Sequence, residues 1–281
     1  MDIKNKTALV TGSTDGVGRV VAERLGAAGF RVLVHGRDET RGKAVIAAIK
    51  ATGGKAELLT ADLASLAEVR RLAAAVRERT DRLDILINNA GVGTGGQGAK
   101  RQVSADGYEL RFAVNYLAGF LLTSELLPLP KASAPSRIVN VASAGQQAID
   151  FDDVMLTRGY SGVRAYCQSK LAQILFTLDL AEQLKGTGIT VNALHPASYM
   201  DTTMVRQAGV TPWSSVETGA DAILNLAASP ALEGRNGLYF DGQRESRANA
   251  QAYDEKARRQ LRALSLDLTG QPSPKSKEQQ S

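Results

Sequence analysis

The chain of 281 residues contains one cysteine, two histidines and no apolar run long enough to span a bilayer. Cys167 alone cannot form a disulfide within the chain, and His35 and His195 lie too far apart in sequence to suggest a zinc cluster. A transmembrane helix needs roughly 20 apolar residues, and the polar start, Met1 to Lys6, lacks the apolar core of a signal peptide. These absences predict a cytoplasmic protein without a metal, whose chemistry comes from side chains or an organic cofactor.

The charge of the chain is positive, with a formal net charge of +5, yet the basic residues are scattered. The only dense basic segment is the polar C-terminal region from Arg244 onward, which indicates solvated surface rather than a nucleic-acid interface. With 43% hydrophobic and 22% charged residues, the chain can bury a sizeable core. One large α/β domain fits this length and composition as well as two small ones.

Short apolar runs alternate with longer segments of helical periodicity from one end of the chain to the other. This alternation predicts a single α/β domain over residues 1–269, with a Rossmann-type, doubly wound parallel sheet. The expected strands are Thr7 to Val10, Arg31 to His35, Ala56 to Thr60, Ile85 to Asn88, Arg137 to Ala142, Thr190 to Leu194 and Leu238 to Phe240. The first expected helices are Val17 to Ala28, Glu39 to Ala51 and Leu66 to Arg79.

The longest helical patterns cover Ala105 to Leu127 and Val163 to Leu184. The second is rich in leucine, which suggests that part of it packs against a partner subunit in a homo-oligomer, a dimer or a tetramer. The final residues, 270–281, are rich in Gln, Ser, Pro and Lys without periodicity and are predicted to form a disordered tail.

A glycine-rich turn, Thr11 to Gly18 (TGSTDGVG), follows the first strand and opens the first helix. Such a turn lets the backbone approach a pyrophosphate, and the helix N-terminus offers unpaired N–H groups to it. Three glycines in a tight turn can also reflect backbone geometry alone. The position between the first strand and the first helix favours dinucleotide binding.

The end of the second strand carries Gly36 and Arg37 where NAD-binding enzymes place a carboxylate for the ribose hydroxyls. The guanidinium of Arg37 suits a phosphate, and Arg41 lies one helical turn later. The pattern therefore favours NADP(H). The alternative is that Arg37 is an ordinary solvated loop residue.

Tyr166 and Lys170 lie four residues apart on a helical segment, so their side chains share a face. An adjacent ammonium and an oxidised nicotinamide would lower the pKa of a phenol toward the working range, which makes Tyr166 a candidate acid/base. Ser143 follows the fifth strand, where open α/β sheets bind ligands, and its hydroxyl can donate to a substrate oxygen. Taken singly, these residues also fit a surface pair and a turn-capping serine.

The ordered set of motifs resembles the short-chain dehydrogenase/reductase superfamily over residues 6 to about 242. Its parts are Thr11 to Gly18, Asp62-Leu63, Asn88-Asn89-Ala90-Gly91, Asn115, Ser143, Tyr166-Cys167-Gln168-Ser169-Lys170 and His195-Pro196. The resemblance implies that Asn115 maintains a helix kink and a water of the proton relay. The implied catalytic residues are Asn115, Ser143, Tyr166 and Lys170. The implied cofactor-binding residues are Gly12, Ser13, Thr14, Gly16, Val17, Gly18, Arg37, Asp62, Leu63, Asn89, Ala90, Gly91, Tyr166, Lys170, Pro196 and Thr202.

Within the superfamily, the segment from Tyr166 to Phe176 is similar to the retinol dehydrogenase and WW-domain oxidoreductase branch. The longer spacing from Ser143 to Tyr166 agrees, and its extra residues, 146–162, are expected to form a loop over the active site. Two features depart from the family pattern. Asp15 stands where some NADP-using relatives carry a base, and the segment after Pro196 lacks the usual glycine, so either Thr202 or Thr203 would bind the carboxamide.

The connection from Pro196 to Ser215 contains several large apolar residues and is expected to form a lid over the substrate. The sequence thus predicts an NADP(H)-dependent oxidoreductase that transfers hydride to or from a carbonyl or secondary alcohol. The apolar lid favours an apolar or aromatic substrate. A catalytically silent NADP-sensing regulator is the alternative. Nucleotide-sugar epimerases have another glycine spacing and a larger C-terminal domain, which this chain lacks.

Overall fold

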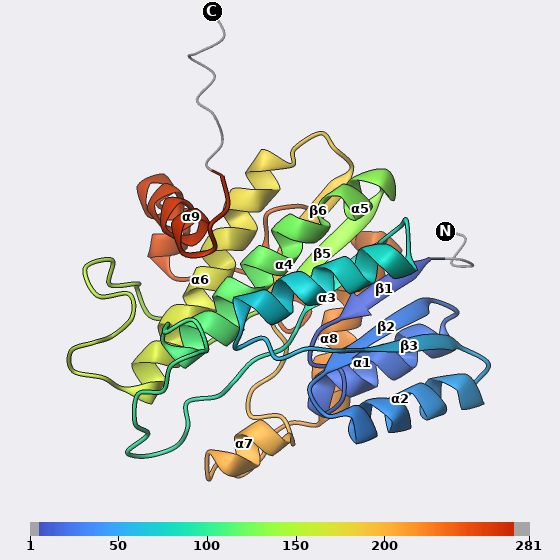
Figure 1. Ribbon diagram of the computed structural model, residues 1–281, viewed down its shortest axis with the longest axis horizontal. Helices are drawn as coiled ribbons and strands as arrows, with labels where there is room; N and C mark the ends of the chain where they lie inside the picture. Colours follow the sequence, from blue (N-terminus) through green and yellow to red (C-terminus); the bar gives the residue numbers. More distant parts are fainter. Residues whose placement is uncertain (1–5, 273–281) are drawn as a thin grey trace, which may run out of the picture.

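An eight-stranded sheet runs through the described part of the chain, residues 6–272 of the computed structural model (Figure 1). The strand order is β3-β2-β1-β4-β5-β6-β7-β8, and neighbours are parallel except for the antiparallel pair β7 and β8. The strands are β1 (Thr7–Val10), β2 (Arg31–Gly36), β3 (Lys55–Thr60), β4 (Ile85–Asn88), β5 (Ser136–Val141), β6 (Ile189–His195), β7 (Tyr239–Asp241) and β8 (Arg244–Ser246).

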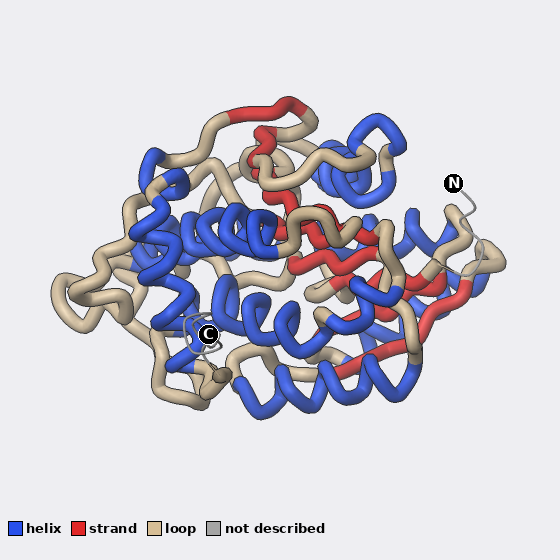
Figure 2. Tube along the Cα trace, turned by 90° about the horizontal axis from the view of Figure 1, so that it is seen from above, coloured by secondary structure: helices blue, strands red, loops and turns tan. Residues whose placement is uncertain are grey.

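Helices cover both faces of this sheet, as Figures 1 and 2 show. One face packs against α1, α2 and α8, and the other against α3, α4, α6 and α9. The helices are α1 (Gly16–Ala27), α2 (Glu39–Ala51), α3 (Leu66–Arg79), the π-helical η1 (Phe112–Leu117), α4 (Ala118–Leu126), α5 (Pro128–Ala132), α6 (Gly162–Gln183), α7 (Thr203–Gln207), α8 (Val216–Ala228), the short η2 (Pro230–Leu232) and η3 (Ala250–Tyr253), and α9 (Glu255–Leu268).

The alternation of side chains along each strand divides the core into two layers. In β1, Leu9 points to the face covered by α3 and α6, whereas Ala8 and Val10 point to the face covered by α1. All three side chains are fully buried. Strands buried on both faces are apolar at most positions, which is why the sequence shows near-continuous apolar runs here.

The predicted fold class is confirmed, and each predicted strand has a counterpart whose ends agree within two residues. The prediction for residues 105–127 is wrong at its start, because the helical segment begins only at residue 110. Gly107 adopts φ 84°, and the Ser104 hydroxyl accepts the N–H groups of Asp106 and Tyr108. Such local hydrogen bonds compete with helix formation and keep residues 105–109 in a turn.

The C-terminal part contains two elements that the sequence did not predict, β8 and α9. Helix α9 lies beside α6 in Figure 1 and buries Leu261 in the core that α6 shares. The leucines of α6 from residue 171 to 184 are thus buried within one chain, apart from the half-buried Leu178. The apolar face of α6 therefore gives no support for a partner subunit, and the homo-oligomer stays a prediction.

The predicted tail, residues 270–281, falls mostly outside the described residues, since the description ends at residue 272. Within the described part, no helix combines the length and apolar character that crossing a membrane would require.

Candidate active site

His35, the penultimate residue of β2, fixes the glycine turn after β1. The Gly12 N–H donates to its Nδ1 over 3.1 Å, so the other nitrogen, Nε2, carries the proton and donates to the Ala61 carbonyl over 3.2 Å. Burial lowers the pKa of His35 to about 4. The imidazole is therefore neutral at physiological pH, as an acceptor for a backbone N–H requires.

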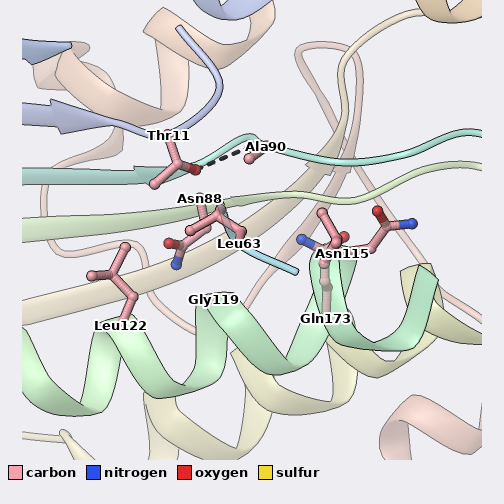
Figure 3. Close-up of a pocket in the computed structure, with 9 residues that line it drawn as sticks. Thr11, Leu63, Asn88, Ala90, Asn115, Gly119, Leu122 and Gln173 are labelled. Carbon is pink, nitrogen blue, oxygen red and sulfur yellow. Dashed lines mark hydrogen bonds between the residues drawn. The ribbon is translucent and has the colours of Figure 1, made fainter. Parts of the chain in front are cut away.

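Asn89, just beyond β4, braces the same turn from the other side. Its Nδ2 donates to the carbonyls of Thr11 and Gly12, at 2.8 and 3.1 Å. The Thr11 hydroxyl in turn accepts the Asn89 and Ala90 N–H groups, the second of which is drawn in Figure 3. The carboxyl ends of β1 and β4 are thus tied together beneath the turn.

The predicted glycines lie where a side chain has no room. A Cβ on Gly18 would lie 2.3 Å from the Gly12 carbonyl oxygen, and one on Gly12 would lie 2.8 Å from Ala90 Cα. Gly12 and Gly16 also adopt positive φ values, 63° and 51°. This cradle of exposed backbone at the start of α1 suits the pyrophosphate of a dinucleotide.

Two predicted cofactor residues have their side chains turned into the protein. The Ser13 hydroxyl is fully buried and donates to the Val10 carbonyl over 2.7 Å. Leu63 is packed in the core beside α3. Any contact that Ser13 makes with a nucleotide is therefore limited to its backbone. Val17 is also buried, whereas Thr14 lies against Gly36, where a Cβ would approach its side chain to 2.4 Å.

The end of β2 carries the charges expected for an adenosine phosphate. Arg37 is 70% exposed, and its guanidinium lies 3.7 Å from the Asp62 carboxylate. Arg41, at the start of α2, is 58% exposed. Together with the side-chain-free Gly36, these two arginines fit a nucleotide that bears an additional phosphate.

Tyr166 and Ser143 face each other across the carboxyl end of β5. A Cβ on Gly145 would lie 3.5 Å from the Ser143 hydroxyl oxygen and 3.7 Å from the Tyr166 ring, and the nearby Ser143 opposes in part the rise in the pKa of Tyr166 that burial causes. The sequence led us to expect that an adjacent ammonium and an oxidised nicotinamide would lower this pKa; in the protein alone, burial is the largest influence and raises it. The phenol therefore stays protonated at neutral pH and can donate a proton.

Lys170 lies one turn along α6 from Tyr166, with Nζ 5.8 Å from the centre of the phenol ring. Its Nζ donates to the Val141 carbonyl over 2.8 Å and to Gln173 Oε1 over 2.9 Å. Burial lowers the pKa of Lys170 to about 7. An ammonium has three donors, so one remains for a ligand. Gln173 is a residue that sequence reasoning missed.

Asn115 lies within the π-helical turn η1, at the position where the resemblance implied a kink. The wider turn brings its amide to the segment after β4, where Oδ1 accepts the Val92 N–H over 2.7 Å and Nδ2 donates to the Val92 carbonyl over 3.1 Å. A Cβ on Gly91 would lie 3.1 Å from Asn115 Oδ1 and 3.6 Å from Lys170 Nζ. The predicted tetrad is thus brought together at the carboxyl ends of β4 and β5; its members are Asn115, Ser143, Tyr166 and Lys170.

A small cavity of about 10 Å³ lies behind these residues, between the glycine turn and α6 (Figure 3). Asn115 and Gln173 line one end of it, and Thr11, Asn88 and Leu63 line the other. This volume is that of about one water molecule. The cavity therefore lies among the residues that hold the site together, and it is too small for a substrate.

The predicted lid, residues 196–215, follows β6 and contains the short helix α7. His195 Nε2 lies 3.1 Å from the Ser198 hydroxyl, and Pro196 is buried. Thr202 caps α7 by accepting the Val205 N–H over 3.3 Å. Exposed aromatic rings border the lid. Tyr199 and Trp213 pack edge to face with ring centres 4.6 Å apart and are 45% and 74% exposed.

Known proteins match the chain over nearly its whole length. Human retinol dehydrogenase 13 is 39% identical, over 99% of this chain and 88% of that protein. Mouse polyprenol dehydrogenase is 38% identical, over 94% and 84%. The structure of the Pseudomonas aeruginosa RhlG/NADP active-site complex has a TM-score of 0.70 and 31% identity, over 85% of this chain and 95% of that one.

The family described as short chain dehydrogenase matches residues 6–212, which contain the glycine turn and α6. The expected resemblance to retinol dehydrogenases is confirmed by these matches. On this basis, and on the geometry above, the chain is an oxidoreductase that belongs to the short-chain dehydrogenase family.

Proposed function

We propose that the protein transfers hydride between NADP(H) and an apolar carbonyl compound or secondary alcohol, and that it works chiefly as a carbonyl reductase. The juxtaposition of Tyr166, Ser143 and Lys170 is the observation that carries this proposal: the Ser143 hydroxyl and the Tyr166 ring both lie beside Gly145, and Lys170 Nζ lies 5.8 Å from the centre of that ring. The apolar lid and the names of the relatives, a retinol dehydrogenase and a polyprenol dehydrogenase, support an apolar substrate. The NADP in the RhlG complex supports the cofactor.

Residues at the carboxyl ends of the strands suit successive parts of the cofactor. Backbone groups of Gly12 to Gly18 would bind the pyrophosphate, Arg37 and Arg41 the adenosine phosphate, and Lys170 the nicotinamide ribose. The segment from Asn89 to Gly91 would border the nucleotide. Either Thr202 or Thr203 would bind the carboxamide of the nicotinamide. When bound, the reduced nicotinamide supplies the hydride.

The residues around the substrate handle its oxygen and a proton. The Ser143 hydroxyl donates to the carbonyl oxygen and orients it toward the Tyr166 hydroxyl, which donates the proton that the oxygen acquires. The Tyr166 phenol is protonated before the reaction, as donation to a carbonyl oxygen requires. The positive charge of Lys170 stabilises the phenolate that remains. Asn115 holds the segment after β4 beside Lys170 by a hydrogen bond to its backbone.

Replacing Tyr166 by phenylalanine tests this assignment. Tyr166→Phe removes the proton donor but keeps the ring, so we expect kcat for NADPH-dependent reduction of a panel of apolar ketones and aldehydes to fall by about 10²- to 10⁴-fold. Binding of NADPH, measured by fluorescence titration, is expected to stay within about twofold, since the hydroxyl is not needed for the phosphate contacts. Near-normal turnover in this variant would refute the role of Tyr166.

Assays of the wild-type protein test the alternative function, that of a sensing regulator. NADPH binding with no turnover of carbonyls, and none of alcohols with NADP⁺, would favour a sensing regulator over an enzyme. The cytoplasmic location and the homo-oligomer are further parts of this proposal. Cell fractionation tests the first, and light scattering coupled to gel filtration tests the second.

A further inference from the structure

Asp15, the residue before the second glycine of the turn, joins three parts of the molecule. Its Oδ1 accepts the Gly16 N–H over 2.7 Å. Its Oδ2 accepts the Thr203 hydroxyl over 2.8 Å and lies 3.3 Å from Nη1 of Arg41. One carboxylate thus contacts the glycine turn, the lid and the start of α2.

The contact with Thr203 belongs to a close approach of the lid to the turn. Thr203 is the first residue of α7, and the neighbouring Thr202 side chain would lie 3.3 Å from a Cβ on Gly16. The first turn of α7 therefore lies against the backbone that is proposed to bind the pyrophosphate. The hydrogen bond to Asp15 is the polar contact that anchors it there.

The contact with Arg41 concerns the charge around the adenosine phosphate. Arg41 lies between two carboxylates, Asp15 at 3.3 Å and Asp38 at 3.5 Å, while Arg37 is paired with Asp62. Two guanidinium groups thus share three carboxylates, which leaves the cluster with a formal charge of −1. A phosphate dianion that binds here competes with these carboxylates for the arginines.

We propose that Asp15 is a specificity-determining residue with two separable effects. Its charge competes with the 2′-phosphate of NADP for Arg41 and so limits the preference for NADPH over NADH. Its hydrogen bond to Thr203 anchors the lid on the glycine turn. The first effect rests on the proposed function, because it presupposes that the phosphate binds at Arg37 and Arg41.

The charge effect is tested with Asp15→Asn, which removes the charge but keeps an oxygen that can accept from Thr203. We expect the Kd for NADPH, from fluorescence titration, to fall by about five- to tenfold and that for NADH to stay within about twofold, since one unit charge near the phosphate is removed. Adenosine 2′,5′-bisphosphate, which lacks the nicotinamide, should gain as much affinity as NADPH. The gain should shrink as salt is raised.

Asp221→Asn is the matched control. Asp221 is an exposed carboxylate on α8 that also pairs with an arginine, Arg24 near the end of α1. Its replacement changes the net charge by the same amount and should leave the ratio of the two Kd values unchanged. If Asp15→Asn leaves this ratio unchanged, or changes it no more than Asp221→Asn does, the charge effect is refuted.

The lid effect is tested by hydrogen exchange of the amides of residues 199–210 in the protein without nucleotide. Thr203→Val and Asp15→Ala both remove the hydrogen bond and should speed this exchange at least severalfold, whereas Asp15→Asn should leave it close to wild type. Equal exchange in Asp15→Ala and in the wild-type protein would overturn the anchoring role.

Arg37→Ala separates a failure of this inference from a failure of the proposed cofactor. It should weaken NADPH binding about tenfold or more with little change for NADH. If Arg37→Ala affects both nucleotides equally, the NADP proposal fails. If it weakens NADPH alone while Asp15→Asn has no effect, only the role of Asp15 fails.

Discussion

His35 shows how one buried side chain determines the shape of a ligand-binding turn. The Nδ1 lone pair accepts the N–H of Gly12, and no protonated imidazole could do so. Burial lowers the pKa of His35 to about 4 from an ordinary value of 6.5. Between these two values, the unfolded chain binds a proton that the folded chain does not. The stability that neutral His35 contributes is therefore complete above pH 6.5 and is lost as the pH falls toward 4.

His35→Asn tests this pH dependence, because an amide oxygen can replace the Nδ1 acceptor without titrating. We expect the wild-type protein to lose, relative to the variant, about 2 kcal/mol of stability between pH 7 and pH 4.5. This corresponds to a relative shift in Tm of roughly 4–8 °C for a chain of this size. Thermal unfolding at both pH values measures it. A difference between the two proteins that does not change with pH would contradict the prediction.

The sequence predicted the residue types of the site better than their contacts. The spacing of Tyr166 and Lys170 already places both on one helical face, and the glycine pattern already predicts a tight turn. The acceptor for Gly12 comes from a strand 23 residues further along the chain, and no local pattern indicates it. The same holds for the competition of Asp15 and Asp62 for the two arginines, because these pairs form only once the strands lie side by side.

At the scale of elements, a buried ion pair joins two of the loops that border the site. Arg111 and Glu109 are 4% and 1% exposed and lie 3.3 Å apart. Arg111 also donates to the Gly93 and Thr94 carbonyls, each over 2.8 Å, and to the Tyr160 hydroxyl over 2.6 Å. The segment after β4 and the loop before α6 are thus linked through one guanidinium. Its five N–H donors in a plane suit this role.

Arg111→Met should destabilise the protein strongly, because it leaves the Glu109 carboxylate buried and unpaired. We expect a loss of about 3–5 kcal/mol, or a fall in Tm of roughly 6–20 °C. The double variant Glu109→Gln/Arg111→Met removes the orphan charge and should recover part of the loss. Differential scanning calorimetry of the three proteins tests this. A double variant less stable than Arg111→Met would show that the carboxylate is not the cause.

The helix prediction for residues 105–127 was wrong at its start for a related reason. Apolar periodicity continues through this stretch, but Asp106 accepts the Leu66 N–H over 2.9 Å and so caps α3 from a distance. A turn that serves another element cannot be recognised from its own sequence. The basic helix α9 was missed because the charged residues of this region indicated solvated surface, although Leu261 and its apolar neighbours form a face that packs in the core shared with α6.

At the scale of the whole molecule, α9 packs against α6 and so extends the helical layer on one face of the sheet. Leu261 is 1% exposed, and the Ser265 hydroxyl lies 2.6 Å from the hydroxyl of the buried Tyr116 in η1. Arg262 pairs with Asp179 of α6 over 3.1 Å. The C-terminal helix therefore contacts both the helix that carries Tyr166 and the π-helical turn that carries Asn115, and it belongs to the folded core of one chain.

Leu261→Ala should consequently lower stability rather than dissociate an assembly. Truncation of a buried leucine costs about 2–5 kcal/mol, so we expect Tm to fall by roughly 4–20 °C. The mass measured by light scattering should stay that of the wild-type protein, because the apolar face of α6 is covered within the same chain. Arg259→Ala, on the exposed side of α9, is the control and should shift Tm by about 1 °C or less. A Leu261→Ala protein with unchanged Tm but a smaller mass would mean that this helix serves a subunit interface instead.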